Sequence, residues 1–202
     1  MLEHRAALDQ LCPARHAQAI DDPRLCVMPI TDCRLLLVQG NAEDPILRER
    51  IHRVLGLALP APLKASVRLG TAILWLGPKE WLIETTVPAS ATVQLWRAGA
   101  DPGAEASGLH AITDQSDAFA GFDLSGPRAV DVLMSGCSLD LAPRAFPVGH
   151  AARTAIADVP AIIWSPMAAA PTSSPSGHFR CWLDRSFAAH FWDWLAESPS
   201  RW

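Results

Sequence analysis

Apolar residues follow two different periods along the chain, and the change from one to the other predicts the first elements. Residues 25–40 are rich in aliphatic and β-branched side chains and favour strand structure. Residues 41–56 then change to a helical period, with apolar positions at Leu47, Ile51, Val54 and Leu55. Asp44 is placed to cap this helix, Pro45 suits its first turn, and Gly56 suits its end.

The remaining chain continues to alternate short strands with helices. The pattern predicts a hairpin over 72–85, a helix over 88–99, a strand pair over 109–126, a helix over 127–136, a strand pair over 152–164, a strand over 178–184 and a helix over 187–198 capped by Ser186. Neighbouring strands often lack a helical crossover, which favours antiparallel pairing. The predicted fold class is therefore α+β, with two ferredoxin-like β-α-β halves and mainly antiparallel sheets.

The same pattern divides the chain into three regions. Residues 1–24 have no clear apolar period, and we expect an N-terminal docking arm there. Residues 25–115 would form the first α+β half and residues 116–202 the second. We expect the two halves to form one compact unit.

Composition and charge exclude several classes of partner. The 202 residues are 50% hydrophobic, enough for a sizeable core, and the net charge of −4 does not attract nucleic acid or an anionic membrane. The first 20 residues are charged and interrupted, so they indicate neither a signal peptide nor a membrane span, and the expected compartment is the cytoplasm. The five cysteines are scattered without a C-x-x-C pair, which favours reduced thiols over a zinc or redox site.

Known catalytic motifs are absent from the sequence. It contains no G-x-S-x-G, no phosphate-binding G-x-x-x-x-G-K-[ST], no G-x-G-x-x-G and no H-E-x-x-H. None of the seven histidines lies three or four residues from another. We therefore predict no catalytic, cofactor-binding or metal-binding residue in this chain.

The segment 113–133 concentrates polar side chains and turn residues. One interpretation makes Asp114 and Asp117 acid–base groups or cation ligands with Ser116 as a hydrogen-bond partner, which needs a second cluster that is not visible locally. The other has these side chains bonding backbone N–H groups at a turn, while Gly126 and Pro127 make a tight entry into the next helix. We favour this framework interpretation.

Tryptophan usage indicates a partner surface. The chain has eight tryptophans and no tyrosine, and three of them lie in its last dozen residues. Tryptophan is enriched at protein interfaces. In the last predicted helix one face collects Phe187, Phe191, Trp194 and Leu195. Trp192 falls to one side of that face, so Trp192 and Trp202 are the predicted interface residues.

Four segments carry a resemblance to a known family. They are "LWLGPKEWLIET", "ITDQSDAFAGFDLSGPRAVDVLMSGCSLDL", "PRAFPVGHAARTAIADVPAIIW" and "RCWLDRSFAAHFWDWL". In order and spacing, from about residue 70 to 196, they resemble the gamma subunits of heterotetrameric sarcosine oxidases. That family is similar to folate-binding aminomethyltransferases such as the glycine-cleavage T-protein. The resemblance implies the T-protein fold and makes Asp114, Ser116, Gly126 and Pro127 framework residues, the first two at the junction between halves.

The resemblance also implies a role. Such complexes oxidatively demethylate sarcosine, or a related N-methyl or cyclic amino acid, giving glycine, hydrogen peroxide and methylene-tetrahydrofolate. The resemblance implies that this chain is a structural subunit without an active site. It also implies that alpha, beta and delta subunits are the partners, with alpha as the direct contact. Those other subunits would hold FAD, FMN, NAD, zinc and tetrahydrofolate.

One departure from the transferase pattern concerns folate. Folate-binding relatives have a glutamate just after a glycine–aromatic pair, and the matching position here is Phe179, after Gly177. Phenylalanine cannot accept hydrogen bonds from a pterin, so we expect no tight folate binding. Two alternatives stay open: a free-standing folate-dependent aminomethyltransferase-like protein, and an unrelated interaction module.

Overall fold

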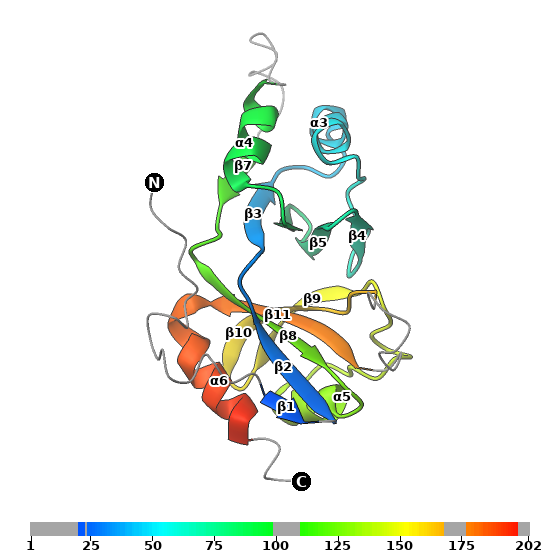
Figure 1. Ribbon diagram of the computed structural model, residues 1–202. Helices are drawn as coiled ribbons and strands as arrows, with labels where there is room; N and C mark the ends of the chain where they lie inside the picture. Colours follow the sequence, from blue (N-terminus) through cyan, green and yellow to red (C-terminus); the bar gives the residue numbers. More distant parts are fainter. Residues whose placement is uncertain (1–19, 23, 99–109, 168–176, 198–202) are drawn as a thin grey trace. The chain divides into compact units, whose positions relative to one another are not determined.

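The computed structural model describes residues 20–22, 24–98, 110–167 and 177–197 (Figure 1). They divide into two compact units. Unit 2 is the continuous segment Asp32–Ser116, whereas unit 1 combines the chain up to Thr31 with the chain from Asp117 onward. Both units are antiparallel sheets with helices, which confirms the predicted α+β class.

Unit 2 contains one five-stranded sheet and two helices. Its elements are β3 (Arg34–Gln39), α3 (Pro45–Leu55), β4 (Ala65–Arg68), β5 (Thr71–Gly77), β6 (Glu80–Thr85), α4 (Ala89–Ala98) and β7 (Ala111–Asp114). The strands lie in the order β4-β5-β6-β3-β7, and all neighbours are antiparallel. Without β4 this is the ferredoxin-like order, with β4 added beside β5 as an outer strand.

The core of unit 2 lies between one face of this sheet and the two helices. Leu36, Ile73 and Ile83 of the sheet pack with Ile51 of α3 and Trp96 of α4. Helix α3 begins and ends as predicted: the Asp44 carboxylate accepts a hydrogen bond from the Ile46 N–H, and Gly56 ends the helix in a left-handed conformation.

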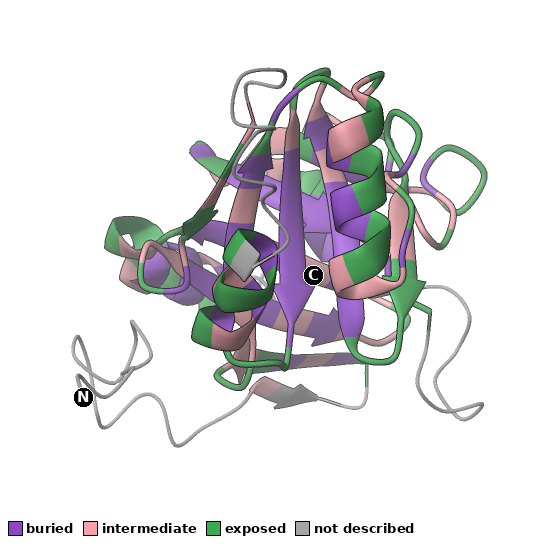
Figure 2. Cartoon of the chain, turned by 90° about the horizontal axis from the view of Figure 1, so that it is seen from above, coloured by how far each residue is buried: buried purple, intermediate pink, exposed green. Residues whose placement is uncertain are grey.

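Unit 1 contains a six-stranded sheet. Its elements are β1 (Ile20–Asp22), β2 (Leu25–Ile30), β8 (Phe119–Ser125), α5 (Ala129–Gly136), β9 (Ala151–Ile156), β10 (Val159–Trp164), β11 (His178–Asp184), the short 3-10 turn η1 (Arg185–Phe187) and α6 (Ala188–Glu197). The strand order is β1-β2-β8-β11-β10-β9, again antiparallel throughout. Its core joins Phe122, Leu124 and Cys181 of the sheet to Leu133 of α5 and Phe191 of α6. In Figure 2 the buried residues concentrate along the central strands.

The two units share one topology. Strands β8, β10 and β11 occupy the sheet positions that β3, β5 and β6 occupy in unit 2, and β9 corresponds to β4. The fourth ferredoxin-like position is filled by β7 in unit 2 but by β2 in unit 1. The prediction of two ferredoxin-like halves is thus confirmed.

The predicted boundary of the first half was wrong at its N-terminal end. Residues 25–30 form β2, which pairs with β8 and belongs to unit 1 rather than to the segment 25–115. Residues 20–22, assigned to the docking arm, form β1 beside β2; residues 1–19 lie outside the described residues. An apolar run marks a strand, but it does not identify which distant strand it pairs with, so the error follows from non-local pairing.

Within the described part of the chain, no helix has the length and apolar character needed to cross a membrane.

Candidate functional site

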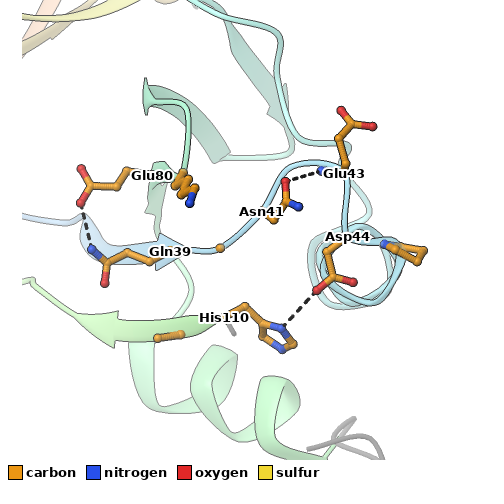
Figure 3. Close-up of a pocket in the computed structure, with 10 residues that line it drawn as sticks. Gln39, Asn41, Glu43, Asp44, Glu80 and His110 are labelled. Carbon is orange, nitrogen blue, oxygen red and sulfur yellow. Dashed lines mark hydrogen bonds and ion pairs between the residues drawn. The ribbon is translucent and has the colours of Figure 1, made fainter. Parts of the chain in front are cut away.

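A pocket with a volume of about 900 Å³ opens in unit 2. It lies where the end of β3, the start of α3, the turn between β5 and β6, and the start of β7 come together (Figure 3). Its polar lining includes Gln39, Asn41, Glu43, Asp44, Glu80 and His110. The pocket therefore combines acidic and amide side chains with one histidine.

His110 is the buried polar group of this pocket. Its side chain is 7% exposed, and its Nε2 lies 2.8 Å from Arg50 Nη1. A guanidinium can only donate, so Nε2 accepts and the proton of the neutral ring sits on Nδ1. Nδ1 points at Asp44 Oδ2, 3.8 Å away (Figure 3). Burial and then the Arg50 charge lower the pKa of His110, against the opposing effect of Asp44, so the ring is held neutral.

Arg50 connects the histidine to the core. Its side chain is buried, and its guanidinium carbon lies 5.4 Å from the centre of the Trp96 ring. The Trp96 and His110 rings meet edge to face, with centroids 5.8 Å apart. Arg50 thus reaches an aromatic face and an imidazole acceptor at once, which offsets part of its desolvation. Asp44, His110, Arg50 and Trp96 form a buried polar cluster behind the pocket.

The backbone around the pocket is shaped for close packing. A Cβ on Gly40 would lie 2.7 Å from Leu47 Cδ2 and 3.0 Å from His110 Cβ, so a side chain there would displace the Leu47 side chain and crowd His110, just before β7. The Gly40 N–H donates to the Lys79 carbonyl at 3.0 Å, and Gln39 Nε2 donates to Glu80 Oε1 at 2.9 Å. The pocket can hold water or a small polar group by hydrogen bonds. Among the described residues, no three histidine, cysteine or acidic side chains gather as metal ligands.

A second polar cluster lies on the sheet of unit 1. Asp123 of β8 accepts hydrogen bonds from His178 Nε2 at 2.8 Å and from Arg180 Nε at 2.9 Å, both on β11. Burial by itself raises the pKa of Asp123, but the bonds and charges of His178 and Arg180 outweigh it and lower the pKa below its ordinary value. This cross-strand cluster fixes the register between β8 and β11.

Asp114 and Ser116 act on the backbone at the end of β7. Asp114 Oδ1 accepts from the Ser116 N–H at 3.0 Å and from its hydroxyl at 2.7 Å. The Ser116 hydroxyl oxygen in turn accepts from the Leu35 N–H at 3.1 Å, and the Gln115 N–H donates to the Leu35 carbonyl at 2.8 Å. These bonds tie the end of β7 to β3 within unit 2, a use that agrees with the framework interpretation.

Gly126 and Pro127 lie at the entry to α5. Gly126 has a φ of 124°, and a Cβ there would lie 2.5 Å from the Arg24 carbonyl oxygen. Its N–H donates to the Gly177 carbonyl at 3.1 Å. A side chain is thus excluded both by φ and by neighbouring backbone. Phe179, the second residue of β11, is 3% exposed and packs in the core, where the centroids of its ring and the Phe146 ring are 6.4 Å apart.

Trp192 is a core residue in this structure. It is 7% exposed, and its ring stacks on Phe122 with centroids 6.1 Å apart. The apolar face assigned from the sequence was out of phase, because Phe187 belongs to η1 and α6 begins at Ala188. The buried face is Ala188, Phe191, Trp192 and Leu195. An interface at Trp192 stays a prediction, although burial leaves it little side chain to offer; Trp202 lies outside the described residues.

The His110 cluster could not be found by reading the sequence. The sequence indicates Asp44 only as a helix cap, and 66 positions separate it from His110. Neither residue belongs to a motif, and the pairing arises from β3–β7 register. The one available signal was Gly40 directly before a capped helix, which indicates a close approach of some other segment.

Comparison with known proteins agrees with this architecture. The family model described as "Sarcosine oxidase, gamma subunit family" matches residues 39–201. The chain belongs to the sarcosine oxidase gamma subunit family. It is 36% identical over 165 residues to sarcosine oxidase subunit gamma of Corynebacterium sp. (strain P-1), covering 81% of this chain and 72% of that relative. It is 37% identical over 113 residues to the subunit gamma of Arthrobacter sp, covering 54% of this chain and 52% of the relative.

Solved structures share the fold. A chain of the heterotetrameric sarcosine oxidase from Corynebacterium sp. U-96, in complex with pyrrole 2-carboxylate, superposes with a TM-score of 0.81 at 24% identity, covering 98% of this chain and 95% of that one. The glycine cleavage system aminomethyltransferase T from Bartonella henselae gives a TM-score of 0.56 at 14% identity, covering 84% of this chain and 44% of that one. The predicted T-protein-like fold is thus confirmed.

Proposed function

We propose that this chain is the gamma subunit of a sarcosine oxidase-type heterotetramer and supports its assembly without an active site of its own. The observation that carries the proposal is the family match over residues 39–201. The polar clusters agree with it, since Asp44, Asp114 and Asp123 each bond backbone or neighbouring side chains. Such bonds build a scaffold rather than a reaction centre.

The reaction belongs to the whole complex. The complex oxidatively demethylates sarcosine, or a related N-methyl or cyclic amino acid, and gives glycine, hydrogen peroxide and methylene-tetrahydrofolate. Alpha, beta and delta subunits are the partners, with alpha in direct contact, and they hold FAD, FMN, NAD, zinc and tetrahydrofolate. The complex works in the cytoplasm. The named relatives support the heterotetrameric oxidase itself. The cofactors, the alpha contact, the folate product and the cytoplasm are what the family resemblance implies.

The test is affinity purification of the tagged chain from its native cells, with mass spectrometry and an absorbance spectrum of the eluate. We expect three further chains and a flavin spectrum. A colourless eluate that contains only the tagged chain would contradict the proposal, because a gamma subunit should stay bound to its complex.

The second candidate is a free-standing folate-dependent aminomethyltransferase-like protein, and the T-protein fold is what favours it. Phe179 argues against it, since its ring packs in the core of unit 1 where a pterin ligand would need an acid. Calorimetry with tetrahydrofolate separates the two: we expect no binding to the isolated chain, whereas micromolar binding would favour the transferase. An unrelated interaction module predicts neither flavin nor folate.

A further inference from the structure

The outer strand of unit 2 presents an exposed apolar edge. We call residues 63–69, which contain β4, the β4 edge. Leu63, Val67 and Leu69 are 48%, 51% and 89% exposed. β4 ends the strand order of its sheet, and no strand of the described chain pairs with its outer side. An exposed edge with apolar side chains is a template for another strand.

The backbone of the β4 edge has a defined direction. Arg68 and Thr71 are opposite each other across the two-residue turn Leu69–Gly70, so the groups of Arg68 bond β5. In an antiparallel pair the backbone groups of every second residue face the neighbouring strand, so those of Ser66 and Lys64 also face β5. The hydrogen bond from the Trp75 N–H to the Lys64 carbonyl, at 3.1 Å, agrees with this alternation. The N–H and C=O of Ala65 and Val67 therefore point away from β5, where an added strand would bond them.

The turn that ends the β4 edge is strained. Leu69 has a φ of 45° and Gly70 a φ of 75°, and leucine rarely adopts a positive φ. A polar residue such as asparagine fits this position better and would also suit its exposure. A strained conformation at an exposed apolar tip indicates that the leucine is kept for contact rather than for folding.

The corresponding hairpin of unit 1 shows what a covered tip is like. Its turn residues Ala157 and Asp158 also have positive φ, at 53° and 63°. There the Ala157 N–H donates to the Gly136 carbonyl at 2.9 Å, and the Ala157 carbonyl lies 3.1 Å from His190 Nε2. The edge strand β9 is bridged by Cys137 at Ile156. Unit 1 thus covers its own hairpin tip and the adjoining end of its edge strand.

Charge decides what kind of strand fits the β4 edge. Lys64 and Arg68 are exposed beside Ala65 and Val67, and Arg68 Nη1 also donates a hydrogen bond to the Gly56 carbonyl at 3.1 Å. If two copies paired antiparallel through these outward groups, Lys64 of one would face Arg68 of the other twice, and like charges opposite each other repel. A second copy is therefore disfavoured, and a segment with acidic residues opposite Lys64 and Arg68 is favoured.

We infer that the β4 edge is a strand-addition site for an extended, acidic segment of a partner subunit. The inference rests on the proposed function, because it requires a complex. Backbone groups of Ala65 and Val67 bond the added strand, Leu69 packs on its apolar side chains, and the basic residues pair its acids.

The test compares partner recovery by tagged full-length variants in native cells that lack the untagged chain. Val67→Pro removes an outward N–H and leaves the inward ladder intact. Leu69→Asn removes the apolar tip and suits the positive φ. We expect each to lower recovery by about tenfold or more, and Lys64→Glu by about threefold. Leu95→Gln changes a leucine that is 57% exposed on α4 and is the matched control, with unchanged recovery.

Thermal unfolding of the purified chains separates docking from folding. Leu69→Asn should unfold at the wild-type temperature or above it, because asparagine accommodates the left-handed conformation. Wild-type recovery by Val67→Pro and Leu69→Asn would overturn the inference and leave the gamma-subunit function intact. A wild-type chain that recovers no partner would instead contradict both. A wild-type dimer that Val67→Pro turns into a monomer would show that a second copy occupies the edge.

Discussion

Unit 1 and unit 2 have the same strand order but obtain their fourth strand differently. In unit 2, β7 is the next described element after α4, whereas unit 1 takes β2 from the segment that precedes unit 2. Each fourth strand then continues into the first strand of the other unit, β2 into β3 and β7 into β8. Unit 2 is therefore a continuous stretch of sequence, whereas unit 1 is assembled from two separate stretches.

The second helix of each unit also carries a tryptophan, in different surroundings. Trp192 of α6 stacks on Phe122, whereas Trp96 of α4 faces Arg50 and His110. The same topology thus accepts either an apolar contact or a polar cluster around the tryptophan of its second helix. The difference predicts that the two tryptophans respond differently to substitution and to pH.

The largest effect is expected from truncating these tryptophans. Trp192→Ala should lower the free energy of unfolding by about 4 kcal/mol, through lost burial and a cavity against Phe122. Trp96→Ala should have a similar effect and also expose Arg50, which raises the pKa of His110 toward its ordinary value. Urea unfolding measures the first effect, and the NMR titration of His110 measures the second. An unchanged stability for Trp192→Ala would support an interface role for that residue over a core role.

The entry glycines give the next contrast. Gly40 and Gly126 occupy equivalent positions in the two units. Their N–H groups donate to the carbonyls of Lys79 and Gly177, the residues just before β6 and β11. Gly126→Ala combines a φ of 124° with a 2.5 Å approach to a carbonyl oxygen, and we expect a loss of about 3 kcal/mol. Gly40→Ala meets mainly the flexible Leu47 side chain, with an expected loss of about 1.5 kcal/mol.

Gly149→Ala is the control for this pair. It has a φ of 81° but no atom within 4 Å of an added Cβ, so it isolates the conformational part of the effect. Urea midpoints of the three variants should fall in the order Gly126, Gly40, Gly149 from the most to the least destabilised. If Gly149→Ala matched Gly126→Ala, φ alone would explain the loss.

Local chemistry explains which features were predictable. The helix capped by Asp44 and ended by Gly56 was placed correctly because both signals lie within the helix's own neighbourhood. The position of β2 and the pairing of His110 with Asp44 depend on contacts between distant segments. The last helix shows an intermediate case, since Asp184 caps the 3-10 turn η1, which contains Ser186, and α6 begins after that turn at Ala188. Either residue is a competent cap, so sequence alone did not fix the phase.

A smaller effect on stability is expected from the N-terminal cap of the first helix, which α3 of unit 2 has and α5 of unit 1 lacks. Helix α3 begins with the Asp44 carboxylate bonded to the Ile46 N–H at 2.9 Å, whereas Arg128 before α5 makes no side-chain cap. Asp44→Ala should lower the free energy of unfolding by about 1 kcal/mol, and Arg128→Ala by less than about 0.5 kcal/mol. Urea unfolding of both variants checks the contrast. Equal losses would mean that the Asp44 side chain contributes no cap.

The smallest effect is expected from pH, and it separates the two polar clusters. The pKa of His110 is lowered from 6.5, so the unfolded chain binds a proton first and stability falls as pH drops below about 6.5. The pKa of Asp123 is lowered from 3.8, so its contribution is present above that value and is lost only as pH falls through the lower, folded pKa. Both slopes have the same sign, but their pH windows differ.

Urea unfolding between pH 7.5 and pH 3 tests this difference. His110→Gln should flatten the pH dependence of the unfolding free energy below pH 6.5 and leave the acid end unchanged. Asp123→Asn should do the reverse, because its carboxyl stays ionised across the histidine window. Trp192→Phe, which changes the apolar contact with Phe122, should keep both slopes. If the pH dependence of the unfolding free energy below pH 6.5 survived His110→Gln, another histidine would control it. The polar cluster of unit 2 would then be as insensitive to pH as the contact between Trp192 and Phe122 in unit 1.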